Sequence, residues 1–168
     1  MKVSFIVPFE GYYHYLADCF ESIQDQNIDD IETLLITEKK DEQLDDLLPV
    51  LKQYAKKKNT ILVITGKIDL VLDENNCYVI HNGHEMMSSY TGSGCQLSGL
   101  ISCFVCANQG HSLEAAALAV MAYGISGEIA YELLSKQQGN MSYRNHVIDI
   151  LSIIDYQMIK ERMKYEIK

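Results

Sequence analysis

The sequence lacks several features that define whole classes of protein. It has no tryptophan and only two prolines in 168 residues, and no apolar run reaches the ~20 residues that a membrane-spanning helix needs. The N-terminus lacks the charged, apolar and small-residue order of a secretory signal peptide. No internal repeat and no Pro/Gly-rich linker divides the chain. These absences predict a cytoplasmic protein that does not insert into a membrane.

The chain is also short of basic residues. Its 14 Lys and Arg stand against 23 Asp and Glu, which gives a net charge of −9. A field of this sign repels polyanions, so nucleic acids and anionic membrane surfaces are poor partners. A small phosphate-bearing ligand is still compatible with it, because local backbone N–H groups can outweigh a remote net charge.

Cysteines give no regular framework, because the chain has five, at positions 19, 77, 95, 103 and 106. Reduced thiols are therefore expected. Cys103 and Cys106 have a spacing found in zinc sites, but no second pair lies nearby to complete about four ligands. Residues three apart share one face of a helix, so we expect this pair to pack against the core. His81 and His84 could in principle join Cys95 around a metal, although their spacing matches no known site.

With 48% hydrophobic residues, the chain can bury one sizeable core, and residues 1–168 are predicted to form a single α/β domain. Short apolar runs typical of buried strands alternate with segments in which apolar residues have helical spacing. Strands are predicted at residues 2–9, 32–37, 60–65, 69–72 and 77–81. Helices are predicted at residues 13–24, 43–58, 94–108, 112–136 and 142–163. The turn signal at residues 73–76 predicts a hairpin between the last two strands.

The most informative segment is residues 91–95, Thr-Gly-Ser-Gly-Cys, which leads directly into an apolar stretch at residues 97–105. Glycines let the backbone approach a phosphate closely, and a helix that begins near Cys95 directs unpaired N–H groups and its positive dipole end at the same point. The segment therefore predicts an anion-binding loop next to a nucleophile-type side chain. The alternative is a tight turn beside a buried structural thiol.

Five segments of the chain carry a wider pattern, at residues 61–66, 69–72, 78–84, 91–95 and 113–127. Their order and spacing resemble the C-terminal half of the hydroxyethylthiazole kinases, which are thiamin-salvage enzymes of the ribokinase-like superfamily. The resemblance covers about residues 46–160. It implies a three-layer α/β fold with a mostly parallel sheet, a β-hairpin and a helical C-terminal part. It also implies ATP-dependent phosphorylation of the hydroxyl group of 4-methyl-5-(2-hydroxyethyl)thiazole.

The resemblance also implies the roles of individual residues. Thr65 corresponds to an ATP contact, Gly92 to a contact with the thiazole alcohol, and Cys95 to the catalytic base, where related kinases carry an aspartate. The backbone of Gly92, Ser93, Gly94 and Cys95 corresponds to the anion hole. ATP and Mg²⁺ are the implied cofactors, and a homotrimer with active sites between subunits is the implied assembly. The family's upstream half, which holds an Asn-x-x-Glu magnesium motif, has no counterpart found here.

Residues 1–40 resemble a different family, because their strand, helix and strand pattern looks like the start of a family-two glycosyltransferase. That family has an Asp pair at the end of its second strand, where this chain has Thr37 and Glu38. A seam between the two patterns is therefore predicted within residues 38–60, where charge is densest.

Three functions follow from these patterns. The first is a hydroxyethylthiazole-kinase-like phosphotransferase whose pocket is completed by an oligomer or another polypeptide. The second is a non-catalytic phosphate- or nucleotide-binding or assembly module that keeps the anion-binding loop. The third, disfavoured by Thr37 and Glu38, is a glycosyltransferase-like fragment.

Overall fold

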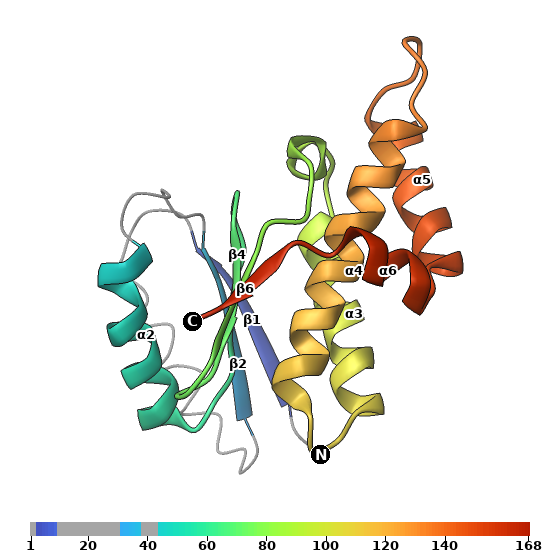
Figure 1. The fold of residues 1–168 in the computed structure, drawn as a ribbon. Coiled ribbons are helices and arrows are strands. Elements are labelled where there is room, and N and C mark those ends of the chain that lie inside the picture. Colours follow the sequence, from blue (N-terminus) through green and yellow to red (C-terminus); the bar gives the residue numbers. More distant parts are fainter. Residues whose placement is uncertain (1–2, 10–30, 38–43) are drawn as a thin grey trace.

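The structure is a computed structural model that describes residues 3–9, 31–37 and 44–168 (Figure 1). The predicted helix at residues 13–24 lies outside these described residues. Along the chain the elements are β1 (Val3–Phe9), β2 (Ile31–Thr37), α2 (Leu44–Lys58), β3 (Leu62–Ile64), β4 (Asp69–Leu72), β5 (Cys77–Ile80), the 3₁₀ helix η2 (Glu85–Ser89), α3 (Ser93–Ala107), α4 (Ser112–Glu132), α5 (Asn140–Ile153), α6 (Tyr156–Arg162) and β6 (Tyr165–Ile167).

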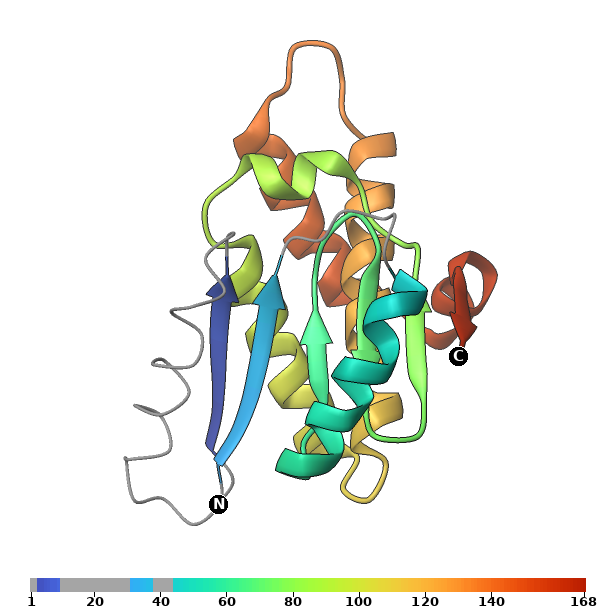
Figure 2. The same cartoon turned by 90° about the vertical axis from the view of Figure 1, so that its left-hand side faces the viewer.

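The strands form two hydrogen-bonded groups that lie side by side, with β2 next to β3 (Figure 2). β1 and β2 pair in parallel, whereas β3, β4, β5 and β6 pair in that order and antiparallel. An α/β fold with a hairpin between β4 and β5 is therefore confirmed. The connections at residues 65–68 and 73–76 are too short to join parallel neighbours, so β3, β4 and β5 pair antiparallel.

The hairpin turn forms as its residues predict. The Asp73 carboxylate accepts hydrogen bonds from the backbone N–H groups of Asn75 at 2.7 Å and Asn76 at 2.8 Å. Asp73 N–H also donates to the carbonyl oxygen of Asn76 at 3.0 Å. This side-chain-to-backbone bonding is what favours aspartate in turns.

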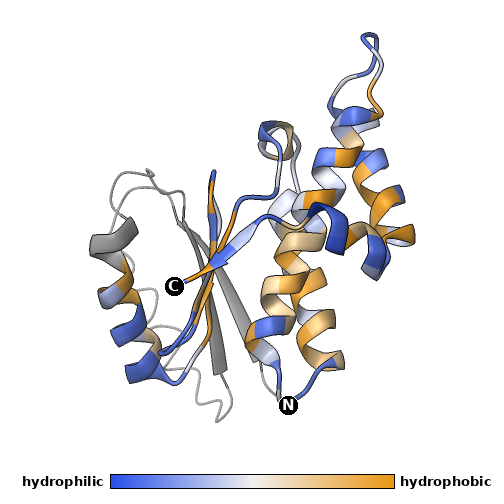
Figure 3. Ribbon diagram, viewed as in Figure 1, coloured by the Kyte–Doolittle hydropathy of each residue, from blue (hydrophilic) through white to orange (hydrophobic). Residues whose placement is uncertain are grey.

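Helices cover both faces of the strands, with α2 on one side and α3 and α4 on the other (Figure 1). Because side chains alternate across a strand, each strand supplies both cores. Val63 and Val71 pack into the core beneath α3 and α4. Leu62, Ile64 and Leu70 pack into the core beneath α2. Figure 3 shows the same division, with hydrophobic residues along α3 and α4 and hydrophilic residues on the outer side of α2.

The central element of the larger core is α4, which is buried on nearly all sides. Its length and apolar composition would suffice to cross a membrane, but 83% of the apolar window is buried inside the protein. Small residues let neighbouring segments approach it closely. A Cβ atom placed on Gly124 would lie 2.8 Å from the backbone carbonyl carbon of Asn82. α4 is thus a core helix that packs directly against the chain following β5.

The C-terminal part differs from the single helix predicted at residues 142–163. The chain leaves the helical conformation at Ile154, and the Asp155 carboxylate caps a new helix, α6, by accepting from Met158 N–H at 2.9 Å. The last residues then form β6, which pairs Ile167 with Tyr78 of β5. The predicted helix at residues 112–136 also ends earlier, at Glu132. The aspartate was an N-cap signal, and the helical spacing on both sides of it concealed the break.

Candidate functional site

A cavity of about 750 Å³ lies at the C-terminal end of β3. It is lined by the turn between β3 and β4, the segment around η2, the first turn of α3 and the middle of α4. Three of the predicted site residues, Thr65, Ser93 and Gly94, line this cavity. Gly92 and Cys95 belong to the same loop but are not among the lining residues. The structure therefore brings the end of β3 and the loop at residues 91–95 to the same cavity.

The loop has the backbone of an anion-binding helix start. Gly92 has a φ of 97°, a left-handed conformation that favours glycine, and α3 begins at the next residue. The first intrahelical hydrogen bond runs from Gln96 N–H to the carbonyl oxygen of Gly92 at 2.9 Å. The N–H groups of Ser93, Gly94 and Cys95 precede it and have no partner within the helix. No side chain from the N-cap position covers them, so they are available to a ligand.

Cys95 is exposed on the first turn of α3. The alternative of a buried structural thiol is therefore wrong for this residue. Its placement alone does not assign it a catalytic role, which remains a prediction.

Beneath the loop lies a group of buried hydroxyl residues that sequence reasoning missed. The Tyr90 and Tyr123 hydroxyls are 2.7 Å apart, and the Tyr123 hydroxyl donates to the carbonyl oxygen of Ser93 at 2.9 Å. The Gln96 side-chain oxygen lies 3.0 Å from the Tyr90 hydroxyl and 3.1 Å from the Tyr123 hydroxyl. Burial raises the pKa of Tyr123 far above its usual value, and the neighbouring Tyr90 adds to this effect. Tyr123 is therefore a neutral hydrogen-bonding group at physiological pH.

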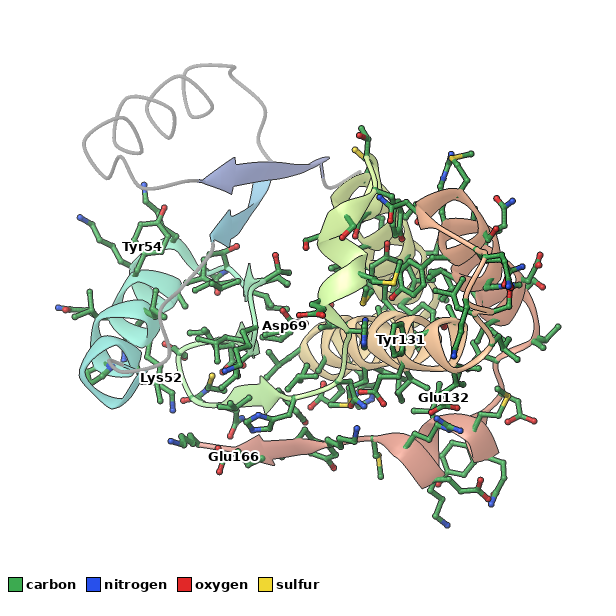
Figure 4. All side chains as sticks on the ribbon, turned by 90° about the horizontal axis from the view of Figure 1, so that it is seen from above. Lys52, Tyr54, Asp69, Tyr131, Glu132 and Glu166 are labelled. Carbon is green, nitrogen blue, oxygen red and sulfur yellow. The ribbon has the colours of Figure 1, made fainter. Side chains whose placement is uncertain are left out.

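Asp69 is one of two carboxylate residues that line the cavity, the other being Glu85. Figure 4 shows it between β3 and the helices α3 and α4, and it lines the cavity four residues after Thr65. Its Oδ1 accepts a hydrogen bond from Gly66 N–H at 2.9 Å. Burial raises the pKa of Asp69 to about 7, although the hydrogen bond from Gly66 acts in the opposite direction. Nothing local in the sequence distinguishes Asp69 from Asp73, which lies in the turn between β4 and β5.

The opposite wall of the cavity is held by Asn82, which is buried. Its side-chain amide donates to Glu128 Oε1 at 3.2 Å and to the carbonyl oxygen of Arg162 at 2.9 Å, and its Oδ1 accepts from Lys164 N–H at 2.8 Å. Glu128 Oε1 also accepts from Gly83 N–H at 3.0 Å, and its Oε2 lies 3.1 Å from Lys164 Nζ. Glu128 is partly buried. It ties α4 to the cavity wall and to the C-terminal segment.

No metal cluster is found in the part of the chain that the structure describes, since no three His, Cys, Asp or Glu side chains gather around one point there. His81 instead lies 3.9 Å from Glu166, and His84 Nδ1 accepts from Met86 N–H at 3.2 Å. Cys103 and Cys106 are exposed on α3, so the expectation that they pack against the core is wrong. Residues three apart do share a helix face, but that face points to solvent here.

Comparison with known proteins places this arrangement in a family. The sequence profile of the hydroxyethylthiazole kinase family matches residues 37–157. The chain belongs to this family. The predicted resemblance over residues 46–160 is therefore confirmed, whereas the likeness of residues 1–40 to a glycosyltransferase stays a prediction.

Individual relatives agree with the family assignment. Hydroxyethylthiazole kinase from Clostridium acetobutylicum is 41% identical over 127 residues, which cover 76% of this chain and 46% of the relative. The protein of the same name from Alkaliphilus oremlandii is 38% identical over 127 residues, covering 75% of this chain and 46% of that protein. The chain thus spans about half the length of the curated relatives it matches.

A solved structure shows the same fold. The hydroxyethylthiazole kinase protein from Pyrococcus horikoshii OT3 superposes with a TM-score of 0.74 at 24% identity, covering 97% of this chain and 65% of that one. At this level of identity the match establishes the fold alone.

Proposed function

We propose that this chain provides the ATP-binding and phosphoryl-transfer part of an alcohol kinase that phosphorylates 4-methyl-5-(2-hydroxyethyl)thiazole. The observation that carries the proposal is the cavity in which Thr65 and the uncapped first turn of α3 meet. Family membership supports the reaction type. The cavity volume of about 750 Å³ lies within the roughly 300–1,000 Å³ typical of small-molecule sites.

In the proposed reaction the hydroxyl oxygen of the alcohol attacks the γ-phosphorus of ATP, and the bond from that phosphorus to the bridging oxygen of ADP breaks. Cys95 accepts the hydroxyl proton, and Thr65 binds the nucleotide. The N–H groups of Ser93, Gly94 and Cys95 stabilise the charge that develops on the transferred group, because they are fixed before the reaction begins. Gly92 borders the alcohol.

Magnesium is implied by the resemblance. Magnesium in kinases is bound by one or two carboxylates together with substrate phosphates. Two carboxylates line the cavity, those of Asp69 and Glu85, and one oxygen of Asp69 already accepts from Gly66 N–H. These two residues would hold the ion, which would neutralise negative charge on the phosphates; no step of the reaction is assigned to it.

The oligomeric assembly and the sheet of the complete fold are part of the same proposal. We propose, from the family resemblance, that a second subunit, in a trimer, or another polypeptide completes the alcohol pocket. We also propose that β1, β2 and β3, which point the same way in Figure 2, belong to the three-layer, mostly parallel sheet of a ribokinase-like fold. The TM-score of 0.74 supports this. Residues 1–168 would then form one cytoplasmic domain, with the seam within residues 38–60 inside it.

A phosphate- or nucleotide-binding module without turnover is the second candidate. The observation that favours it is the position of Cys95, which is exposed and does not line the cavity. In this case the loop would bind ATP, and no phosphorylated alcohol would form.

The test uses two glycines of α3, one in its first turn and one further along the helix. A Cβ atom at Gly94 or at Gly99 would meet nothing within 4 Å outside the local helix backbone, so both positions have room for a side chain. Only Gly94 lines the cavity. Isothermal titration with ATP should show weaker binding to Gly94→Val than to the wild type, and unchanged binding to Gly99→Val.

An ATP-dependent phosphorylation assay with the thiazole alcohol then separates the two candidates. Product formed by the wild type supports the kinase, and ATP binding without product supports the binding module. Equal ATP affinity in the wild type and both variants would exclude the loop from either function.

A further inference from the structure

The first turn of α3 is held in an unusual way, through its oxygen atoms. A typical helix start is fixed by a Ser, Thr, Asp or Asn side chain that accepts hydrogen bonds from the first free N–H groups. Gly92 occupies that position here and has no side chain to offer. The Tyr123 hydroxyl, from the middle of α4, instead contacts the carbonyl oxygen of Ser93 at 2.9 Å and its hydroxyl at 3.2 Å.

Counting protons gives one consistent direction for these hydrogen bonds. Each phenol has one proton to donate. If Tyr123 donates to the Ser93 carbonyl, the short 2.7 Å contact between the two phenols requires Tyr90 to donate to Tyr123. The order is then Tyr90 to Tyr123 to Ser93, in which Tyr90 orients the Tyr123 hydroxyl, and the Gln96 side-chain oxygen is a second acceptor within reach of both phenols.

Burying the Tyr90 and Tyr123 hydroxyls costs free energy, and filling the core does not require these hydroxyls. Tyr90 and Tyr123 are 8% and 3% exposed, so both hydroxyls lose most of their contact with water. Burying hydroxyls is unfavourable unless they are hydrogen-bonded, and phenylalanine would fill the same space without that cost. The hydroxyls are therefore useful for what they bind, which is the start of α3.

Because Tyr123 contacts the oxygen atoms of Ser93, the N–H groups in the first turn of α3 stay free. An N-capping side chain would occupy the N–H groups that an anion needs, and the tyrosines leave those groups free. A helix start with neither device frays, because its first turn has few hydrogen bonds of its own. The tyrosine arrangement provides both a rigid turn and open N–H donors.

We propose that Tyr123, oriented by Tyr90, is a positioning residue that holds the first turn of α3 in its anion-binding geometry. The proposal rests on the proposed function in one respect, namely that the N–H groups of the loop bind phosphate. Its structural part, the stiffening of the turn, is measurable without any ligand.

The experiment compares Tyr123→Phe with Tyr143→Phe. Tyr143 is a matched control, because it is also buried and its hydroxyl donates one hydrogen bond, to the carbonyl oxygen of Gly127 at 3.0 Å. Both changes remove one buried hydroxyl and keep the ring, and only Tyr123 contacts the loop. A third variant, Tyr90→Phe, removes the group that orients Tyr123 and should give an intermediate effect.

The first measurement is amide hydrogen exchange at Gln96, whose N–H closes the first turn of α3 by donating to Gly92. Loss of one hydrogen bond should speed this exchange on the order of tenfold in Tyr123→Phe, with no change in Tyr143→Phe. The second measurement is the affinity for inorganic phosphate and for ATP, which should fall in Tyr123→Phe and not in the control.

The outcomes distinguish the positioning role of Tyr123 from phosphate binding by the loop. If the wild type binds neither phosphate nor ATP, the proposed function fails, and exchange at Gln96 still decides whether Tyr123 stiffens the turn. Unchanged exchange at Gln96 in Tyr123→Phe would overturn the positioning role. Equal acceleration in Tyr123→Phe and Tyr143→Phe would also overturn it, because the effect would then reflect general loss of core stability.

Discussion

Replacing Gly124 with alanine tests whether α4 and the cavity wall are in direct contact. The new Cβ would lie 2.8 Å from both the carbonyl carbon and the carbonyl oxygen of Asn82, and 2.9 Å from its Cβ. These atoms belong to backbone or lie next to it, so no flexible side chain can move aside. Favourable carbon contacts lie at roughly 3.5–4.0 Å, and α4 and the segment that follows β5 must therefore separate.

Two opposing effects determine how much Gly124→Ala changes the free energy of unfolding. Overpacking of a tight core typically costs about 1–3 kcal/mol, while replacing glycine with alanine inside a helix contributes about 0.5–1 kcal/mol in favour. We expect Gly124→Ala to lower the free energy of unfolding by about 1–2 kcal/mol. For a chain of this size, each kcal/mol lowers the Tm by roughly 2–4 °C.

Two further glycines provide controls. Gly99 has open space at its Cβ position, so Gly99→Ala should stabilise the chain slightly. Gly127→Ala would meet the Met87 side chain, which can move, and the Tyr143 hydroxyl at 3.0 Å, so its effect should fall between the other two. Urea unfolding and thermal melting of the three variants give the order. A Gly124→Ala variant as stable as Gly99→Ala would refute the close approach of α4 to Asn82.

Two other predictions concern single side chains of the site. Cys95 is exposed, so Cys95→Asp should change the free energy of unfolding by no more than about 0.5 kcal/mol. If Cys95 is the base, turnover on the thiazole alcohol should survive in Cys95→Asp and drop in Cys95→Ser. Equal turnover in the wild type and both variants would show that Cys95 takes no part in the reaction. Because burial raises the pKa of Asp69 from 3.8 to about 7, the folded chain holds a proton that the unfolded chain has released, and stability should fall as pH rises through this range. Urea titrations across it should show a flatter slope for Asp69→Asn, and the slope of the wild type for Asp73→Asn, whose aspartate caps the other hairpin turn outside the cavity.

Features that depend on neighbouring residues were predictable from the sequence. The bounds of β4 agree with prediction, and α3 begins within one residue of its predicted start. The hairpin between β4 and β5 was equally readable, because the turn residues and the apolar runs lie together in the sequence. The break between α5 and α6 was readable in principle from Asp155, an N-cap type of residue, but the helical periodicity on either side outweighed it.

Features that depend on distant residues were not predictable in this way. Tyr123 lies 30 positions from Ser93, and Glu128 lies 46 positions from Asn82. In the sequence, Tyr123 is one aromatic position and Glu128 one polar position in the mostly apolar helix α4. Packing alone would explain both. The prediction that Cys103 and Cys106 pack against the core was wrong because helical periodicity shows which residues share a face. It does not show whether that face points to the core or to solvent.

The two walls of the cavity are connected through adjacent residues of one helix. Tyr123 reaches the first turn of α3, and Gly124 lies against Asn82 on the other side. One turn further along, Glu128 accepts from Asn82 and from Gly83 N–H and so fixes the same wall. A shift of α4 would therefore move the N–H donors of the loop and the wall opposite them together. Because α4 is buried on nearly all sides, such a shift is costly, and the rigidity of the proposed anion site originates in the core of the protein and not in the loop itself.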